Sequence, residues 1–158
     1  FLTGESHAIA RNFDNQLFFI KYLNKYHGVR HIISEIGYCD AQLVNRYLET
    51  GDEAIVKEIM ENLTGTFGYS KENYQYHLNL YEFNKSLPEN EKLQYIGIDV
   101  QHQTDTGVEY ILSLRPKTEG NNSKVPDSVD GSLSALQSAL EKNEFSGEMI
   151  EEIQNDIK

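Results

Sequence analysis

Three short apolar segments constrain the fold of this chain more than any other feature. They cover residues 1–4, 31–36 and 93–101, and Gly37 closes the second of them. Longer stretches separate these segments, and in them apolar residues recur every three or four positions, as in amphipathic helices. Strands that alternate with helices form right-handed crossovers and lie parallel in one sheet. The sequence therefore predicts an α/β fold with a mostly parallel central sheet of few strands, flanked by helices.

The helical pattern gives bounds for the elements between the strands. Helices are expected over residues 8–26, 41–48, 71–85 and 105–114, with a further one around Ile55 and Ile59. Ser6, Asp40 and Ser70 precede three of these helices. We expect each to cap the helix that follows it, because its side-chain oxygen can accept a free backbone N–H of the first turn.

The chain is expected to form one main domain with a helical tail. Residues 1–116 form the predicted α/β domain, residues 117–132 are expected to be a loop or linker, and residues 133–158 carry a helical C-terminal pattern. Three strands make a thin sheet for a free-standing domain. The chain also opens at Phe1, which has the character of a strand interior. We therefore expect part of a larger fold, completed by self-association or by a downstream region.

Charge and cysteine content limit the partners that this chain can have. The formal net charge is -11, which argues against a protein that tracks nucleic-acid phosphates and favours a small-molecule substrate. No apolar run approaches the roughly 18 residues of a membrane-spanning helix. With Cys39 as its one cysteine, the chain can form no internal disulfide and needs no oxidising compartment. A cytoplasmic location is therefore favoured, while secretion stays open.

Ionisable and amide side chains lie in or just after all three predicted strands. They are Glu5, His7, Glu35, Asp99, Gln101 and His102. Because ligands of open α/β sheets bind at the carboxyl ends of the strands, we expect these side chains to converge on one polar pocket. A hydrogen bond to a backbone amide, or a Lys or Arg partner, would explain each carboxylate taken alone. Arg11 lies one turn beyond His7, where it can bind an anionic group or simply pair with Asp14.

Two chemical schemes fit these residues. In the first, His7 is a general base that takes a proton from water or a substrate hydroxyl, and Glu5 or Glu35 orients its imidazole. In the second, the same three residues bind a divalent metal that activates water. The sequence has neither an HExxH motif nor a cysteine cluster, and a second histidine ligand would have to be His102 or lie outside this sequence. The identity of any cofactor, a divalent metal included, is open at this point.

The three strand ends, read together, resemble a known family. At Gly4-Glu5-Ser6-His7, Ser34-Glu35-Ile36-Gly37 and Ile96-Gly97-Ile98-Asp99-Val100-Gln101, the chain resembles the erythromycin esterase-like family. More remotely, it is similar to the larger group that holds ChaN-type haem-binding proteins and the Tiki metalloproteases. The resemblance spans roughly residues 1–114 and implies an α/β fold with helices around a central sheet.

The resemblance also assigns roles to individual positions. It implies that Glu5, His7 and Glu35 match the pocket residues of the family, with His7 as the base, and that Asp99 matches an acidic residue of the third motif. Ala8 and Arg11 depart from the family pattern, and the further histidines that complete the family site have no equivalent after residue 114. The chain is thus expected to hold half of an active site.

Three hypotheses on function follow from the sequence. The first is a hydrolase that activates water against an ester or related bond. The second is a metal- or haem-binding module. The third is a catalytically decayed interaction domain, which the two departures from the family pattern keep open.

Overall fold

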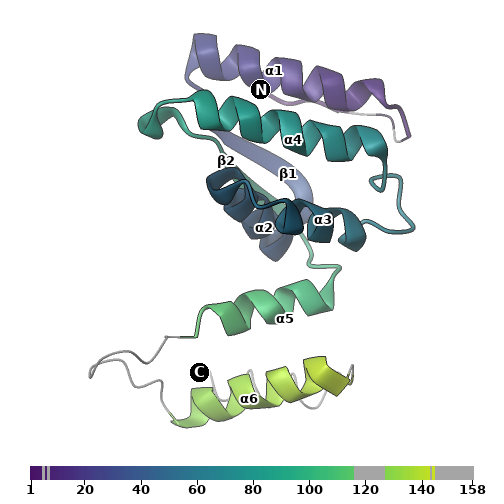
Figure 1. Cartoon of the computed structure of the whole chain (residues 1–158), viewed down its shortest axis with the longest axis vertical. Helices are drawn as coiled ribbons and strands as arrows, with labels where there is room; N and C mark the ends of the chain where they lie inside the picture. Colours follow the sequence, from purple (N-terminus) through teal and green to yellow (C-terminus); the bar gives the residue numbers. More distant parts are fainter. Residues whose placement is uncertain (5, 7, 116–126, 143, 145–158) are drawn as a thin grey trace. The chain divides into compact units, whose positions relative to one another are not determined.

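The structure, a computed structural model, describes residues 1–4, 6, 8–115, 127–142 and 144, and it divides the chain into two compact units, residues 1–102 and 103–158 (Figure 1). The first unit contains, in chain order, α1 (Arg11–His27), β1 (His31–Gly37), α2 (Tyr38–Thr50), α3 (Glu53–Asn62), α4 (Lys71–Ser86), the 3-10 helix η1 (Glu89–Glu91) and β2 (Gln94–Asp99). The second contains α5 (Thr104–Ser113) and α6 (Asp127–Lys142). The boundary after residue 102 differs from the expected domain end at residue 116, because α5 packs with α6.

The mixed α/β fold with a parallel sheet is confirmed, although the sheet has fewer strands than expected. Among the described residues, β1 and β2 pair in parallel and form a two-stranded sheet. The predicted strand at residues 1–4 is wrong, because these residues have no regular secondary structure and are exposed. The ring of Phe1 lies 5.6 Å from that of His27, at the end of α1. An isolated strand leaves its backbone groups unpaired, and no described strand pairs with this segment.

The strand pair contains one irregularity near its carboxyl end. Ser34 lies opposite Gly97 and Gly37 opposite Asp99, so three steps along β1 match two along β2. A Cβ atom at position 97 would collide with the backbone oxygens of Ile36 and Gly37. Glycine at position 97 is therefore what lets the bulged end of β1 approach its neighbour.

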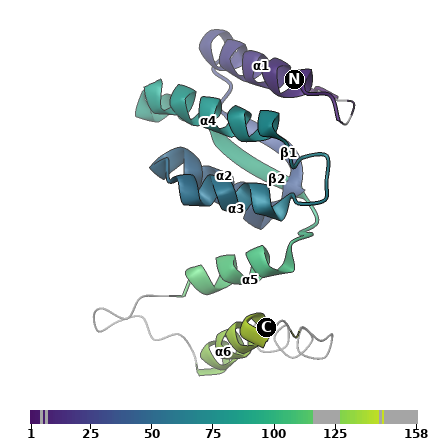
Figure 2. The ribbon, with the colours of Figure 1, turned by 45° about the vertical axis from the view of Figure 1, so that its right-hand side comes forward.

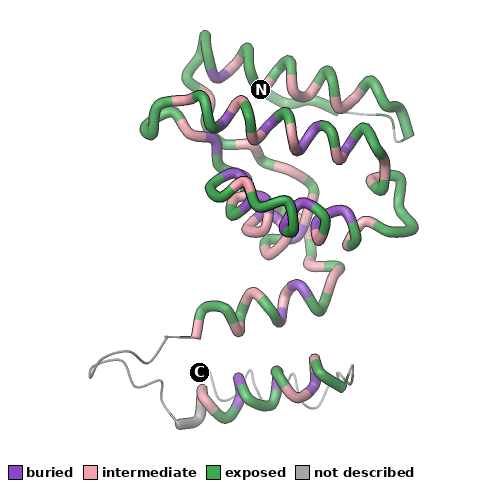
Figure 3. The backbone as a smooth tube through the Cα atoms, viewed as in Figure 1, coloured by how far each residue is buried: buried purple, intermediate pink, exposed green. Residues whose placement is uncertain are grey.

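The hydrophobic core covers one face of the sheet, and its helices bury one side each (Figure 3). Its buried members are Ala41, Val44, Tyr47, Leu48, Ile55, Val56, Ile59, Tyr76, Leu80, Leu93 and Tyr95. Inside it, the hydroxyl groups of Tyr76 and Tyr95 hydrogen-bond to each other, and burial raises the pKa of Tyr76 to about 12. On the opposite face Ile33, Ile96 and Ile98 are exposed. Within the described residues the sheet is thus covered on one side.

The first helix starts later than expected. It begins at Arg11, and its N-cap residue Ala10 makes no side-chain capping bond, so Ser6 is not its cap. Ala8 has a φ of 63°, in the left-handed region that a right-handed helix cannot include. The backbone turn at Ala8 explains why the helix cannot start there.

Two further capping predictions have opposite outcomes. Ser70 is confirmed as the cap of α4, since its side chain accepts the backbone N–H of Asn73. Asp40 is not a cap, because α2 already begins at Tyr38 and places Asp40 within its first turn. The helix follows β1 directly, and this leaves the carboxylate free for other contacts.

The second unit is helical in its described part. The guanidinium group of Arg115, just after α5, pairs with the Asp130 carboxylate of α6. Residues 127–132 of the expected loop belong to α6, whereas residues 117–126 and the expected last helix after Ser146 lie outside the described residues. Across the described residues, no helix combines the length and the apolar character needed to cross a membrane.

Candidate functional site

The carboxyl ends of the two strands meet at one edge of the first unit, because the strands are parallel. The loop between α3 and α4 and the start of α1 lie on the same side in both views of the ribbon (Figures 1 and 2). We call this region, which comprises residues 8–10, 37–40, 62–70 and 99–102, the carboxyl edge. It is where ligands of open α/β sheets bind.

The side chain of Gln101 ties the end of β2 to the first turn of α2. Its Oε1 accepts the backbone N–H of Cys39 at 3.0 Å, and its Nε2 donates to Asp40 Oδ2 at 2.9 Å. A Cβ atom at Gly37 would collide with Gln101 Oε1 and would lie 2.9 Å from Asp40 Oδ2. Glycine at position 37 therefore leaves the space that this bridge occupies, and the amide fixes the orientation of the Asp40 carboxylate.

Asp40 has the clearest electrostatic perturbation at the carboxyl edge. Burial raises the pKa of its carboxyl group above the usual value of 3.8 because desolvation disfavours the charged form. Hydrogen bonds from Gln101 and Asn62, together with the charge of His102, offset part of this rise in pKa. Asp40 thus combines a fixed position with a raised proton affinity, which is the combination expected of a group that exchanges protons.

Asp99 and His102 lie at the same edge and contact each other. The distance from His102 Nε2 to Asp99 Oδ2 is 3.5 Å. Asp99 Oδ1 also accepts the backbone N–H of Val100 at 2.8 Å. Asp99 is half-buried and His102 is exposed, so the imidazole is available to a ligand from solvent.

The remaining predicted site residues have different outcomes. Glu35 is exposed and alternates with the half-buried Ile36, so it faces away from the core, and the structure does not bring it to Asp40. Arg11 is exposed at the first residue of α1. Glu5 and His7 lie outside the described residues, and their predicted roles stay predictions.

A hollow opens where the start of α1 meets the loop before α4. It has a volume of about 370 Å³, within the range of roughly 300–1,000 Å³ typical of small-molecule sites. Residues 8–10 and 66–70 line it, together with Phe13 and Glu72. The hollow therefore lies between the start of α1 and the loop before α4, and its lining does not include Asp40 or Gln101.

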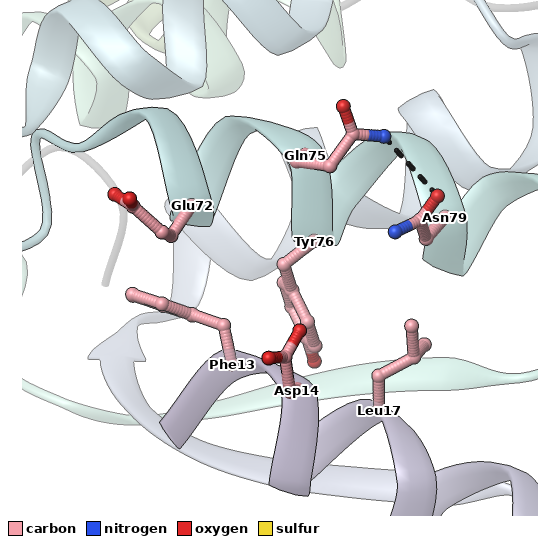
Figure 4. A pocket seen from close by; sticks show the side chains of 7 residues that line it. All are labelled: Phe13, Asp14, Leu17, Glu72, Gln75, Tyr76 and Asn79. Carbon is pink, nitrogen blue, oxygen red and sulfur yellow. Dashed lines mark hydrogen bonds between the residues drawn. The ribbon is translucent and has the colours of Figure 1, made fainter. Parts of the chain in front are cut away.

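A smaller hollow, of about 100 Å³, continues from it between α1 and α4 (Figure 4). Phe13 and Glu72 line both hollows, so the two adjoin. Asp14 reaches in from α1, opposite Glu72 and Gln75 of α4, and Gln75 donates to Asn79 at 3.1 Å. The lining thus combines carboxylates with aromatic and aliphatic groups, and it suits neutral or cationic ligands better than anions.

The metal scheme stays a prediction, because two of its three proposed ligands, Glu5 and His7, lie outside the described residues. No group of three or more His, Cys, Asp and Glu residues among them is placed to hold a metal ion. Asp99 and His102 provide two donors, whereas protein sites for transition metals generally use three or more. Within the described residues, these two donors alone are fewer than a divalent metal site generally uses.

Sequence reasoning missed the central carboxylate of the carboxyl edge. Asp40 was interpreted as a helix cap, although it stands three residues after Gly37, at the point where a buried strand ends. The position of Gln101 was found, but not its function as a bridge to another element. The acid that follows the glycine at the strand end was the available signal.

The comparisons with known proteins give no relative for this chain. No protein-family model, no curated protein and no solved structure matches it.

Proposed function

We propose that this chain carries an active site like that of erythromycin esterase-like hydrolases, which uses water to cleave an ester or related bond. The observation that carries the proposal is the Asp40 carboxylate, which Gln101 holds at 2.9 Å at the carboxyl ends of both strands. A hollow of about 370 Å³ between residues 8–10 and the loop before α4 is large enough for a small substrate. The resemblance at Gly4-Glu5-Ser6-His7 and at the ends of β1 and β2 favours the same reaction class.

The proposed chemistry divides two proton transfers between two groups. His7 takes a proton from water, which then attacks the carbonyl carbon of the ester, and Glu5 orients the imidazole. Asp40 is the proposed proton donor to the departing alkoxide, since Gln101 fixes its carboxyl group and burial shifts its pKa upward from 3.8, toward the protonated form. Glu35 has no role in this scheme, since its side chain lies on the open face of the sheet. Asp40 is the second carboxylate of the scheme in its stead.

The net charge of the protein limits the range of proposed substrates. With a formal net charge of -11, the protein repels anions and attracts cations. The carboxylates of Asp14 and Glu72 next to the hollows act in the same direction. We therefore propose a neutral or amine-bearing ester as the substrate class.

Replacement of the proposed base tests this function. Hydrolysis of p-nitrophenyl acetate and of a set of neutral, cationic and anionic esters is measured for the wild-type chain, for His7→Ala and for the control His27→Ala. His27 is exposed at the far end of α1. We expect His7→Ala to lose at least about 10²-fold in kcat, with an unchanged melting temperature, and His27→Ala to retain full activity. Undiminished turnover in His7→Ala, or no turnover of any ester by the wild-type chain, would reject the proposal.

An interaction domain with a decayed site is the second candidate. The observation that favours it is the exposed face of the sheet with Ile33, Ile96 and Ile98, since exposed apolar surface often marks a binding surface. Ester turnover that depends on His7 separates the two candidates, because a decayed site has none.

A further inference from the structure

The two outer edges of the sheet differ in whether described residues hydrogen-bond to their outward backbone groups. On the β2 side, the Asn45 side chain of α2 takes both backbone groups of Tyr95: Asn45 Nδ2 donates to the carbonyl oxygen at 3.0 Å, and the Tyr95 N–H donates to Asn45 Oδ1 at 2.7 Å. An exposed edge strand invites pairing with another strand. Asn45 satisfies the β2 edge and so closes it to a further strand at this residue.

On the β1 side, no side chain of the described residues covers the edge in this way. The Gln94 N–H donates to the Arg30 carbonyl, and with the parallel register this bond places the inward backbone groups of β1 on Ile32 and Ser34. The groups of Ile33 therefore point outward, and so do those of the residues two positions before and after it. No described residue hydrogen-bonds to the outward groups of Ile33.

The outward residues of β1 are accessible as well as unpaired. His31, Ile33 and Glu35 are all exposed, and 63% of the Ile33 surface is open to solvent. A five-residue stretch of strand whose outward N–H and carbonyl groups bond to no described residue is long enough to pair with another strand.

We propose that the β1 edge binds the β1 edge of a second copy of this chain, antiparallel and centred on Ile33. Ile33 then lies opposite its own equivalent, and His31 lies opposite Glu35 of the second copy, in both directions. Antiparallel partners exchange both backbone bonds at every second residue, which gives about six hydrogen bonds over these three pairs. The product is a continuous four-stranded sheet with β1 of each copy at its centre.

The side chains of the β1 edge favour a second copy of this chain as the binding partner, because they are complementary to themselves. A twofold axis through Ile33 pairs an imidazole with a carboxylate on each side and an isoleucine with an isoleucine in the middle, and both are favourable cross-strand pairs. Pairing that is one step out of this register in either direction would lose the twofold histidine–glutamate match. The exposed isoleucines of the two copies also become one continuous apolar row on the same face of the joined sheet.

The net charge sets the expected strength of this association. Two copies that each carry a charge of -11 repel one another, and pairing of a single short edge buries less surface than a standard interface. The dimer is therefore weak, and added salt strengthens it by screening the repulsion.

The first test of the proposed dimer measures its association as a function of protein concentration. Sedimentation equilibrium of the chain from about 10 μM to 1 mM, at low and at high NaCl, is expected to give a monomer–dimer equilibrium whose dissociation constant falls with salt. Amide hydrogen exchange by NMR is expected to show protection of the Ile33 N–H that grows with protein concentration. Protection that does not depend on concentration would mean that the chain covers its own edge, and a monomer throughout would mean that nothing pairs there. Either result overturns the proposal.

A matched pair of variants locates the interface. Ile33→Lys puts a charge into the centre of the proposed pairing and is expected to weaken the dimer at least about tenfold. Ile98 is as exposed as Ile33, at 69%, but lies on β2, so Ile98→Lys is expected to change the dissociation constant less than about threefold. Equal loss in both variants would mean that two sheet faces pack together, and would overturn edge pairing.

A charge swap tests the register. His31→Glu places two carboxylates opposite one another, and Glu35→Lys removes the carboxylate that faces the imidazole, so each is expected to weaken the dimer by about threefold to tenfold. The double variant His31→Glu/Glu35→Lys restores opposite charges in this register alone, and it is expected to return to the wild-type dissociation constant. Additive weakening in the double variant would refute pairing centred on Ile33.

Discussion

The buried histidine of α4 gives a prediction about stability against pH. His77 is 6% exposed, its Nδ1 atom has no hydrogen-bond partner, and burial lowers its pKa from 6.5 to about 4. A protonated imidazole is thus strongly disfavoured in the folded chain, whereas the unfolded chain takes up the proton readily. The neutral form of His77 is the one compatible with the fold.

The sign and the size of the effect follow from this difference in pKa. The folded pKa is depressed, so the unfolded state binds more protons below pH 6.5, and the free energy of unfolding falls as the pH drops from 6.5 toward 4. At 1.36 kcal/mol per pKa unit, the full loss is about 3 kcal/mol, and about 2 kcal/mol of it is reached by pH 5.

Urea denaturation of three proteins at pH 7.5 and pH 5.0 measures this contribution. The wild-type chain is expected to lose about 2 kcal/mol more between the two pH values than His77→Gln does. The raised pKa of Asp40 acts in the opposite direction, but it is common to both proteins and cancels in the comparison. His102→Gln replaces an exposed histidine and is expected to keep the wild-type dependence. Equal pH dependence in the wild-type chain and His77→Gln would refute the reasoning.

Three further changes test the packing around the sheet, each measured by urea denaturation at pH 7.5. Gly97→Ala forces a Cβ atom onto the backbone of the bulged β1 and is expected to cost about 2 kcal/mol or more; a loss below about 0.5 kcal/mol would contradict the close approach. Asn84→Ala removes the side chain that donates to the Leu48 carbonyl and accepts the Leu93 N–H, and about 2 to 3 kcal/mol is expected because both groups stay buried. Tyr95→Phe leaves a buried hydroxyl without its partner and is expected to cost about 1 to 2 kcal/mol, whereas unchanged stability would mean that the pair contributes nothing.

The sequence predicted secondary structure best where the local residue pattern and the tertiary packing favour the same element. The segment that became β1 is β-branched and closed by Gly37, and the segment that became α4 has its cap at Ser70; both were predicted close to their observed bounds. The segment of residues 1–4 was misassigned because apolar character alone cannot supply a neighbouring strand. Strand formation depends on such a partner more than helix formation does.

The candidate site was only partly accessible from the sequence for a related reason. In a parallel sheet, the residues that follow β2 lie close to those that follow β1. This rule identified Asp99, Gln101 and His102 as candidate site residues. The proposed role of Asp40 depends on a contact between residues 61 positions apart, and no local pattern encodes that contact. Exposure of Glu35 depends on which face the helices leave open, which sequence periodicity does not determine for a short strand.

The central claim is that the carboxyl edge is a reaction site and that Asp40 takes part in proton transfer there. The most direct measurement is kcat/KM for ester hydrolysis by Asp40→Asn, compared with Glu49→Gln, which changes an exposed carboxylate at the end of the same helix. We predict a loss of about 10²-fold or more for Asp40→Asn, with unchanged melting temperature, and no loss for Glu49→Gln. Equal kcat/KM values in the two variants and the wild-type chain would contradict the account.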